Sequence, residues 1–207
     1  GKTVLLDKSF NITGFQKINE ENIFTELHEF QYLDDDTIVQ IGSKSHKYDN
    51  QNVDSGIISI LNQKNGTNFI WDSIDHVSPD SSIVPMKEWG MKSNDYFHMN
   101  AVRILSDGNY LASARHTQTI MKIDKLSGEI IWHMGSGSLN NFKFIDDPYN
   151  GFSHQHAPEE LDNKNILIWD NGIGSIENGS RVCEYQIDEN KLTATLVWSK
   201  EFKDLQA

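Results

Sequence analysis

The chain has 207 residues, long enough for one domain with a sizeable core, and 30 acidic against 18 basic side chains give it a net charge of −12. This acidic surplus repels nucleic acid and anionic membrane surfaces, so we expect no nucleic-acid partner. No stretch approaches the roughly 20 apolar residues that span a bilayer, and a single cysteine, Cys183, excludes an internal disulfide or a multi-cysteine zinc site.

A pattern that occurs three times begins in the N-terminal third of the chain. It opens with His28, passes through the aspartate-rich turn 34–36 into the apolar stretch 37–41, and closes at Trp71. Alternating apolar stretches bounded by turn residues are typical of β-strands joined by hairpins. We expect residues 1–26 to supply strands of a preceding unit.

The second copy opens at His98, turns at 107–109 and closes at Trp132. Gly108 in this turn accepts a positive φ without a Cβ penalty, which favours a hairpin. Residues 119–124 then alternate between apolar and polar, and the strand pattern resumes after a turn at 124–128. The second copy therefore predicts several consecutive strands.

The third copy opens at His156, passes through an Asp/Asn/Lys turn into the apolar stretch 166–169, and closes at Trp198. Residues 185–188 and 193–198 read as two further strands. The sequence shows no amphipathic helix of three turns, so the fold class that we predict is all-β.

The spacing of the repeats predicts a β-propeller. The tryptophans that close them lie 61 and 66 residues apart, which suits one four-stranded blade per repeat. We therefore expect a single propeller domain over 1–207 with about three blades, at approximately 27–71, 97–132 and 155–198, and with the tryptophans packed between blades. Because propellers need roughly four to eight blades to close, we expect this chain to be part of a longer ring or to be completed by a partner chain.

The residues repeated at the start of each blade are candidates for a common site. The innermost strands of a propeller line its central channel, so His28, His98 and His156 should converge there. Asn100 lies two residues after His98 and hence on the same strand face. The planar guanidinium of Arg115 can grip a tetrahedral oxyanion with two parallel hydrogen bonds. These residues predict an anion site.

Several runs in this region resemble one protein family, in order and with matching spacing from about His28 to Trp198. They are Asp95 to Asn100, Asp107 to Leu111, Ser113 to His116, Ile123-Asp124, Gly128 to Trp132, Gln155-His156, Asp170 to Gly172, and Ser180-Arg181 through Glu184-Tyr185. The chain resembles the aryl-sulfotransferases that use no nucleotide sulfate donor, and most closely the branch abundant in fungi and bacteria.

The resemblance implies a six-bladed propeller that transfers a sulfuryl group from an aryl sulfate to a phenol through a sulfo-histidine, without a cofactor and with ping-pong kinetics. The Gln-His motif then gives His156 as the nucleophile. The other motifs give His28, His98, Asn100 and Arg115 as sulfate-holding groups. Members of the family are usually exported, which implies an extracytoplasmic or secreted protein.

Other interpretations of the same residues stay open at this point. His154 lies two residues before His156 and could share its role, or join it and His98 in a three-histidine zinc site. Arg115 would repel such a cation, so we expect no metal. Asn100 could bond the backbone at a bulge, and Arg115 could pair with an acidic side chain.

Two further classes of function compete with sulfuryl transfer: a propeller that binds protein or glycan without chemistry, and a sulfate-ester hydrolase in which water replaces the phenol. The remaining histidines are expected to lie outside the site. We expect His116 and Arg181 to be structural, and His46, His76 and His133 to be solvated.

Overall fold

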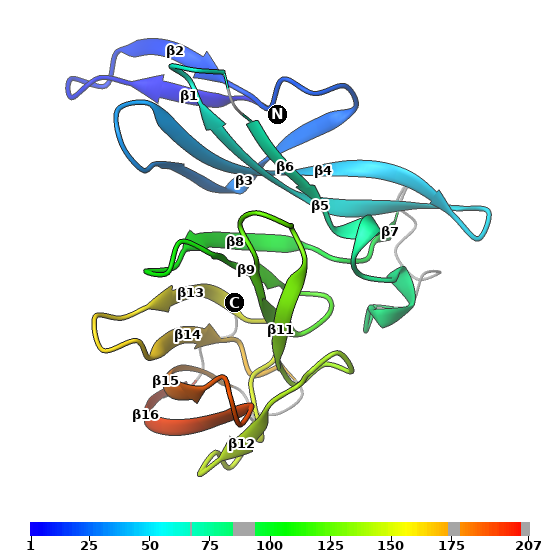
Figure 1. Cartoon of the computed structure of the whole chain (residues 1–207), viewed down its shortest axis with the longest axis vertical. Coiled ribbons are helices and arrows are strands. Elements are labelled where there is room, and N and C mark those ends of the chain that lie inside the picture. The colour runs from blue at the N-terminus through cyan, green and yellow to red at the C-terminus, as the bar shows by residue number, and fades with distance from the viewer. Residues whose placement is uncertain (67, 85–93, 174–178, 204–207) are drawn as a thin grey trace.

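The computed structural model describes four stretches of the chain, residues 1–66, 68–84, 94–173 and 179–203. Their regular secondary structure is almost entirely antiparallel β-sheet (Figure 1). Within these stretches the helical segments are two short 3₁₀ turns, η1 (Ser73–Asp75) and η2 (Pro79–Ser81). Neither has the length or the apolar character to cross a membrane.

Three four-stranded antiparallel meanders follow one another along the chain. The first consists of β3 (Ile23–Tyr32), β4 (Thr37–Tyr48), β5 (Gln51–Asn62) and β6 (Asn68–Asp72). The second consists of β8 (Met99–Ile104), β9 (Tyr110–Ala114), β10 (Thr119–Ile123) and β11 (Ile130–Gly135). The third consists of β13 (His156–Glu160), β14 (Ile166–Asp170), β15 (Gly179–Asp188) and β16 (Thr193–Lys203).

Short strands also occur outside the three meanders. Strand β7 (Asn94–Asp95) pairs in parallel with β5, and β12 (Lys143–Ile145) pairs in parallel with β16. Strands β1 (Thr3–Leu6) and β2 (Ile12–Gln16) form a separate hairpin before the first meander. Figure 1 shows the meanders succeeding one another down the long axis of the molecule.

Aspartate and asparagine side chains shape the turns between strands. Asp34 Oδ1 accepts hydrogen bonds from the backbone N–H groups of Asp36 and Thr37, at 2.8 and 2.7 Å, before β4. Gly108 has a φ of 87° in the turn before β9, where a Cβ would be strained. Such local bonds compete with continued strand pairing, and they end each strand where the sequence predicts a turn.

Two apolar cores lie between the meanders. The first joins residues of β4, β5, β8, β9 and β10, and Trp71 lies in it with its Nε1–H donating to the Gly128 carbonyl at 2.9 Å. The second joins residues of the second and third meanders and includes Trp132. Every residue of β9 and β10 is buried, so both faces of these two strands are covered, including the polar positions of the alternating strand β10.

The predicted all-β fold with about three propeller blades is confirmed by these meanders and the cores between them. Trp71 and Trp132 pack between blades as expected, but Trp198 does not, because 49% of its surface is exposed on β16. The position of Trp198 on the last strand puts no further sheet of the described chain against it.

The β4–β5 hairpin is longer than the predicted strand 37–41 and turns at Asp49 and Asn50, whose φ values are 44° and 61°. His46 therefore lies within the sheet, with Nε2 at 3.0 Å from Asp72 Oδ2. His133 is also partly buried, and burial lowers its pKa to about 4. The expectation that these two side chains are solvated is wrong.

Candidate active site

Three histidines from the three blades meet at one place. His28 lies in β3, His98 in the turn before β8, and His156 begins β13. The ring of His28 is 5.3 Å from the ring of His98 and 6.3 Å from that of His156, measured between centroids. Strands β3, β8 and β13 are the first strands of their blades, and β8 contacts both others, so their side chains converge.

Arg115 and His116 add a guanidinium and a fourth imidazole to this cluster. The backbone N–H of Arg115 donates to the carbonyl of His98 at 3.0 Å, which holds the chain after β9 against the histidine. Nη1 of Arg115 lies 3.1 Å from Nε2 of His116, and the His116 ring lies 4.6 Å from the His98 ring. In a chain of net charge −12, this local grouping of donors suits an anion.

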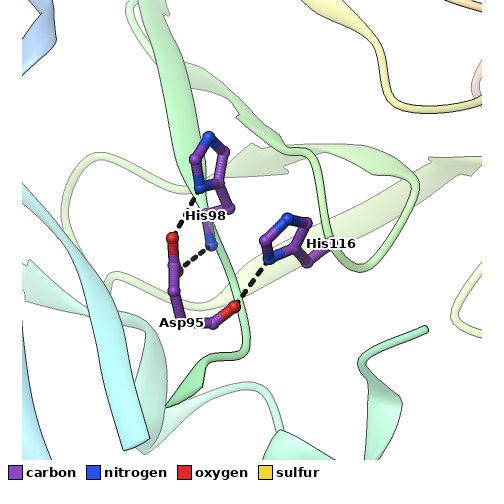
Figure 2. A group of neighbouring side chains, drawn as sticks. All are labelled: Asp95, His98 and His116. Atoms are coloured by element: carbon purple, nitrogen blue, oxygen red, sulfur yellow. Dashed lines mark hydrogen bonds and ion pairs between the residues drawn. The ribbon is translucent and has the colours of Figure 1, made fainter. Parts of the chain in front are cut away.

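Asp95 makes three hydrogen bonds at the site (Figure 2). Its Oδ1 accepts from the backbone N–H of His98 at 2.8 Å, and its Oδ2 lies 2.5 Å from His98 Nδ1. Its carbonyl oxygen lies 2.6 Å from His116 Nδ1. Burial opposes ionisation of Asp95, but the hydrogen bond and charge of His98, with the charge of His116, outweigh it and hold the pKa of Asp95 below its ordinary value.

The environment of His156 favours its neutral form. Burial lowers its pKa most, and the charge of Arg115, with electrostatic interactions from His28 and His98, lowers it further against one opposing backbone hydrogen bond. Its Nδ1 lies 3.2 Å from the carbonyl of His154 and 3.2 Å from Nδ2 of Asn171. The carbonyl accepts only from a protonated Nδ1 and the amide donates only to an unprotonated one, so the two contacts favour opposite tautomers; in the Nδ1–H form the Nε2 lone pair is free.

His154 has different partners from its neighbour His156. Its Nδ1 lies 3.4 Å from Nε2 of Gln118, whose amide donates to it. Burial, with the charges of Arg115, His116 and His156, lowers the pKa of His154 to about 4. His154 is therefore neutral at physiological pH, and its Nδ1 lone pair is occupied.

Asn100 and Gln155 connect the second and third blades beneath the histidines. Asn100 lies at a bulge of β8, and its Nδ2 donates to the carbonyl of Gln155 at 2.7 Å. The buried Nε2 of Gln155 donates to Ser113 Oγ and to the carbonyls of Ala114 and Thr119, at 3.0, 3.0 and 2.9 Å. The bulge interpretation of Asn100 fits these contacts, which hold the backbone next to His156.

A buried ion network anchors the loop that leads to His154. Nε of Arg181 donates to Asp170 at 2.8 Å, and its Nη1 and Nη2 donate to the carboxylate of Asp147 at 2.8 and 3.1 Å. Arg181 Nη2 also donates to the Gly151 carbonyl at 2.8 Å. Asp170 accepts in turn from the backbone N–H of Ser153 at 2.9 Å. Arg181 is structural, as expected.

The donor set does not suit a cation. Among the described residues, the histidine and acidic ligand atoms that come together, within 4.8 Å of one another, belong to Asp95, His98 and His116. Both Nδ1 atoms are already bonded to oxygens of Asp95, and Arg115 lies against His116. The alternative zinc site of His98, His154 and His156 is not formed, because among the described residues the ligand atoms of these three histidines do not come together in the same way.

A cavity of about 40 Å³ lies beside His28 and His98, between the first two blades. Ser55, Glu26 and Asp95 also line it. A space of this size holds water molecules but not an aromatic ring, because ligand pockets are roughly ten times larger.

The structure brings His28, His98, Arg115 and His156 together, and it places Asn100 one contact away from His156. It also adds Asp95 and Gln155, to which the repeat pattern assigned no role. The sequence does contain a signal for the role of Asp95. This carboxylate lies three residues before His98, and Asp side chains often accept from backbone N–H groups two or three residues further along the chain. No sequence pattern indicates the partners of Gln155, which are 36 to 42 residues away.

The comparison with known families gives a match over nearly the whole chain. The family model described as Arylsulfotransferase (ASST) matches residues 8–204. The search of curated proteins found no match. The matched region contains every residue of the cluster described above.

Proposed function

Because the chain belongs to the arylsulfotransferase family, we propose that it transfers a sulfuryl group from an aryl sulfate to a phenol, with His156 as the residue that carries the group. The observation that supports this most directly is the convergence of His28, His98 and His156 beside Arg115. Three imidazoles and a guanidinium supply both a nucleophile and donors for sulfuryl oxygens.

In the first half-reaction, Nε2 of neutral His156 attacks the sulfur of the donor. An N–S bond forms and the S–O bond to the aryl group breaks, with the electron pair leaving on the phenolate. A phenol has a pKa near 10, so the phenolate is a tolerable leaving group. The lowered pKa of His156 keeps the attacking lone pair available near neutral pH.

In the second half-reaction, a phenol oxygen attacks the sulfur of sulfo-histidine. The new S–O bond replaces the S–N bond, the electron pair returns to His156, and the phenol proton is taken up by a base at the site. The donor product leaves before the acceptor binds, which gives ping-pong kinetics.

The other groups of the cluster bind and orient the sulfuryl group. Arg115 offers a planar pair of N–H donors, and His28 and His98 face the same space from the neighbouring blades. Charge shifts between the oxygens during transfer, so fixed donors in place before reaction lower the barrier, as in phosphoryl transfer. Asn100 supports the site by fixing the backbone of Gln155 next to His156.

The test is to mix the complete protein with p-nitrophenyl sulfate and measure the mass of its peptides. We expect an adduct of about 80 Da, one SO₃ group, on the peptide that contains His156, and its loss when a phenol is added. His156→Asn should abolish adduct and turnover while the fold is kept. His154→Asn is the matched control, on the same peptide, and should still form the adduct.

Three outcomes would contradict the proposal in different ways. An adduct that persists in His156→Asn and disappears in His154→Asn would move the nucleophile to His154. Continued turnover of p-nitrophenyl sulfate without a phenol, beyond the one nitrophenol per protein that adduct formation releases, would indicate a sulfate-ester hydrolase. Neither adduct nor nitrophenol from a folded sample would indicate the binding propeller instead.

A further inference from the structure

One residue outside the repeat pattern, Asp95, determines where two of the site's imidazoles carry their protons. A carboxylate and a carbonyl oxygen can only accept, so the ring nitrogens facing them carry hydrogen. The 2.5 Å contact to Oδ2 therefore puts a proton on Nδ1 of His98, and the 2.6 Å contact to the carbonyl puts one on Nδ1 of His116. In both rings the Nε2 atom is left for the site.

The position of the proton on His116 also determines how this ring interacts with Arg115. With its proton on Nδ1, neutral His116 has a lone pair at Nε2, and Nη1 of Arg115 donates to it at 3.1 Å. Burial is the main cause that lowers the pKa of His116, which favours this neutral form. Asp95 thus orients two groups of the cluster, His98 directly and Arg115 through His116.

The backbone around Asp95 is built to hold it there. Strand β7 fixes Asp95 opposite Asp54 of β5, so the residue is anchored to the first blade while its partners belong to the second. His98 has a φ of 51°, a conformation that costs a non-glycine residue energy. The bond from the His98 N–H to Asp95 Oδ1 at 2.8 Å stabilises that conformation.

We propose that Asp95 is a positioning residue that holds His98 in its Nδ1–H form, with Nε2 directed to the sulfuryl site as the base that takes the acceptor's proton. This rests on the proposed function. When the phenol attacks, its proton moves to Nε2 of His98, and Asp95 stabilises the imidazolium that forms. The same proton is returned to the phenolate that leaves the next donor, so protons balance over the cycle.

The surroundings of His98 single out Asp95 for this role. The charged and titratable groups near it are Asp95, Arg115, His116, His28, His156 and, lining the same small cavity, Glu26. Glu26 lies 3.5 Å from Nδ1 of His28, whereas Asp95 is bonded to Nδ1 of His98.

The test is Asp95→Asn in the complete protein, with ¹⁵N NMR of histidine-labelled samples beside kinetics. The new amide must keep its oxygen on the His98 N–H, which turns its NH₂ toward Nδ1 and forces the proton onto Nε2. We expect the ¹⁵N shifts of His98 to report the Nε2–H form and kcat to fall about 100-fold, with KM little changed. His116 is bonded to the backbone and should keep its Nδ1–H in the same spectrum.

Two further variants keep the test decisive. Asp124→Asn removes the same charge from an exposed turn of the second blade and should change neither kcat nor the His98 shifts. If Asp95→Asn fails to fold, Asp95→Ser is the alternative variant. Its hydroxyl oxygen can still accept from the His98 N–H, but the partner of Nδ1 is removed, so kcat should fall while KM changes little. An Nδ1–H form with wild-type kcat in either Asp95 variant overturns the proposal.

The proposed function and the role of Asp95 can fail separately. If the wild-type protein transfers no sulfuryl group, the function is wrong, and the tautomer of His98 in the two proteins still decides whether Asp95 positions it. If the wild type is active and Asp95→Asn is equally active, the function stands and the role of Asp95 is wrong.

Discussion

The guanidinium of Arg115 acts on the candidate nucleophile, His156, through its charge. Burial is the largest cause of the lowered pKa of His156, and Arg115 is the first of the charges that add to it. In the proposed reaction the attack requires neutral His156, so a lower pKa would keep the protein active to lower pH. The charge of Arg115 therefore favours the neutral form of His156.

Arg115→Met removes this charge at similar side-chain length. The pKa of His156 should rise toward its ordinary value, so the acid limb of the rate of histidine sulfation should move to higher pH, and the maximal rate should fall about 100-fold. Single-turnover rates with p-nitrophenyl sulfate between about pH 4 and 8 measure both. Lys125→Met, on an exposed turn of the same blade, is the control and should leave the profile in place; an unmoved acid limb in Arg115→Met would contradict the expectation.

At the scale of elements, the loop between β12 and β13 is held from beneath by charges rather than by strand pairing. Arg181 and the carboxyl groups of Asp147 and Asp170 are almost wholly excluded from solvent. Burial raises the pKa of Asp170 despite its hydrogen bonds, while Arg181 and Tyr185 outweigh burial at Asp147 and lower its pKa. The geometry of the loop therefore depends on all three charged side chains, Asp147, Asp170 and Arg181, being present.

Arg181→Met leaves two buried carboxyl groups without their cation. We expect the free energy of unfolding to fall by about 3–5 kcal/mol, the usual cost of breaking a buried pair by removing one partner. Urea unfolding followed by tryptophan fluorescence measures this. Arg181→Lys keeps the charge but not the fork of donors, so its loss should be smaller; equal stability of the Met variant and the wild type would show that the network is not needed.

At the scale of the whole molecule, one arginine ties the first strands of all three blades together. Arg103 of β8 donates through Nη1 to Glu29 of β3, and through Nε to Glu159 of β13 at 2.9 Å. Gln31 of β3 adds a bond to the Val102 carbonyl at 3.0 Å. These contacts cross the same strand junctions that bring the three histidines together.

Arg103→Leu should loosen the junction between the three blades. Glu29 is 8% exposed and would lose its cation, so we expect the free energy of unfolding to fall by about 2–3 kcal/mol. Differential scanning calorimetry measures the change in Tm. Lys164→Leu removes an exposed lysine that lies 3.9 Å from Glu160, and it should cost less than about 1 kcal/mol. Equal losses in the two variants would contradict a special role for Arg103.

The blades and the convergence of histidines could be predicted because both depend on local patterns. Alternating apolar residues and Asp, Asn or Gly turns determine where strands run, and they do so within about ten residues. A histidine repeated at the start of each first strand then needs only the propeller geometry to reach a common place. The resemblance to a family supplied the chemistry expected there.

The sequence by itself therefore determined the approximate strands, their repeat, the family and four of the residues that meet, His28, His98, Arg115 and His156. The tertiary structure alone decided which oxygen each imidazole faces, that Asn100 and Gln155 hold the backbone beside His156, and that Arg103 and Arg181 join distant segments. The reason is physical: a hydrogen bond forms or fails over a few tenths of an ångström. Whether two side chains from different blades come within that distance depends on how the sheets pack. Local sequence patterns contain no information on this packing.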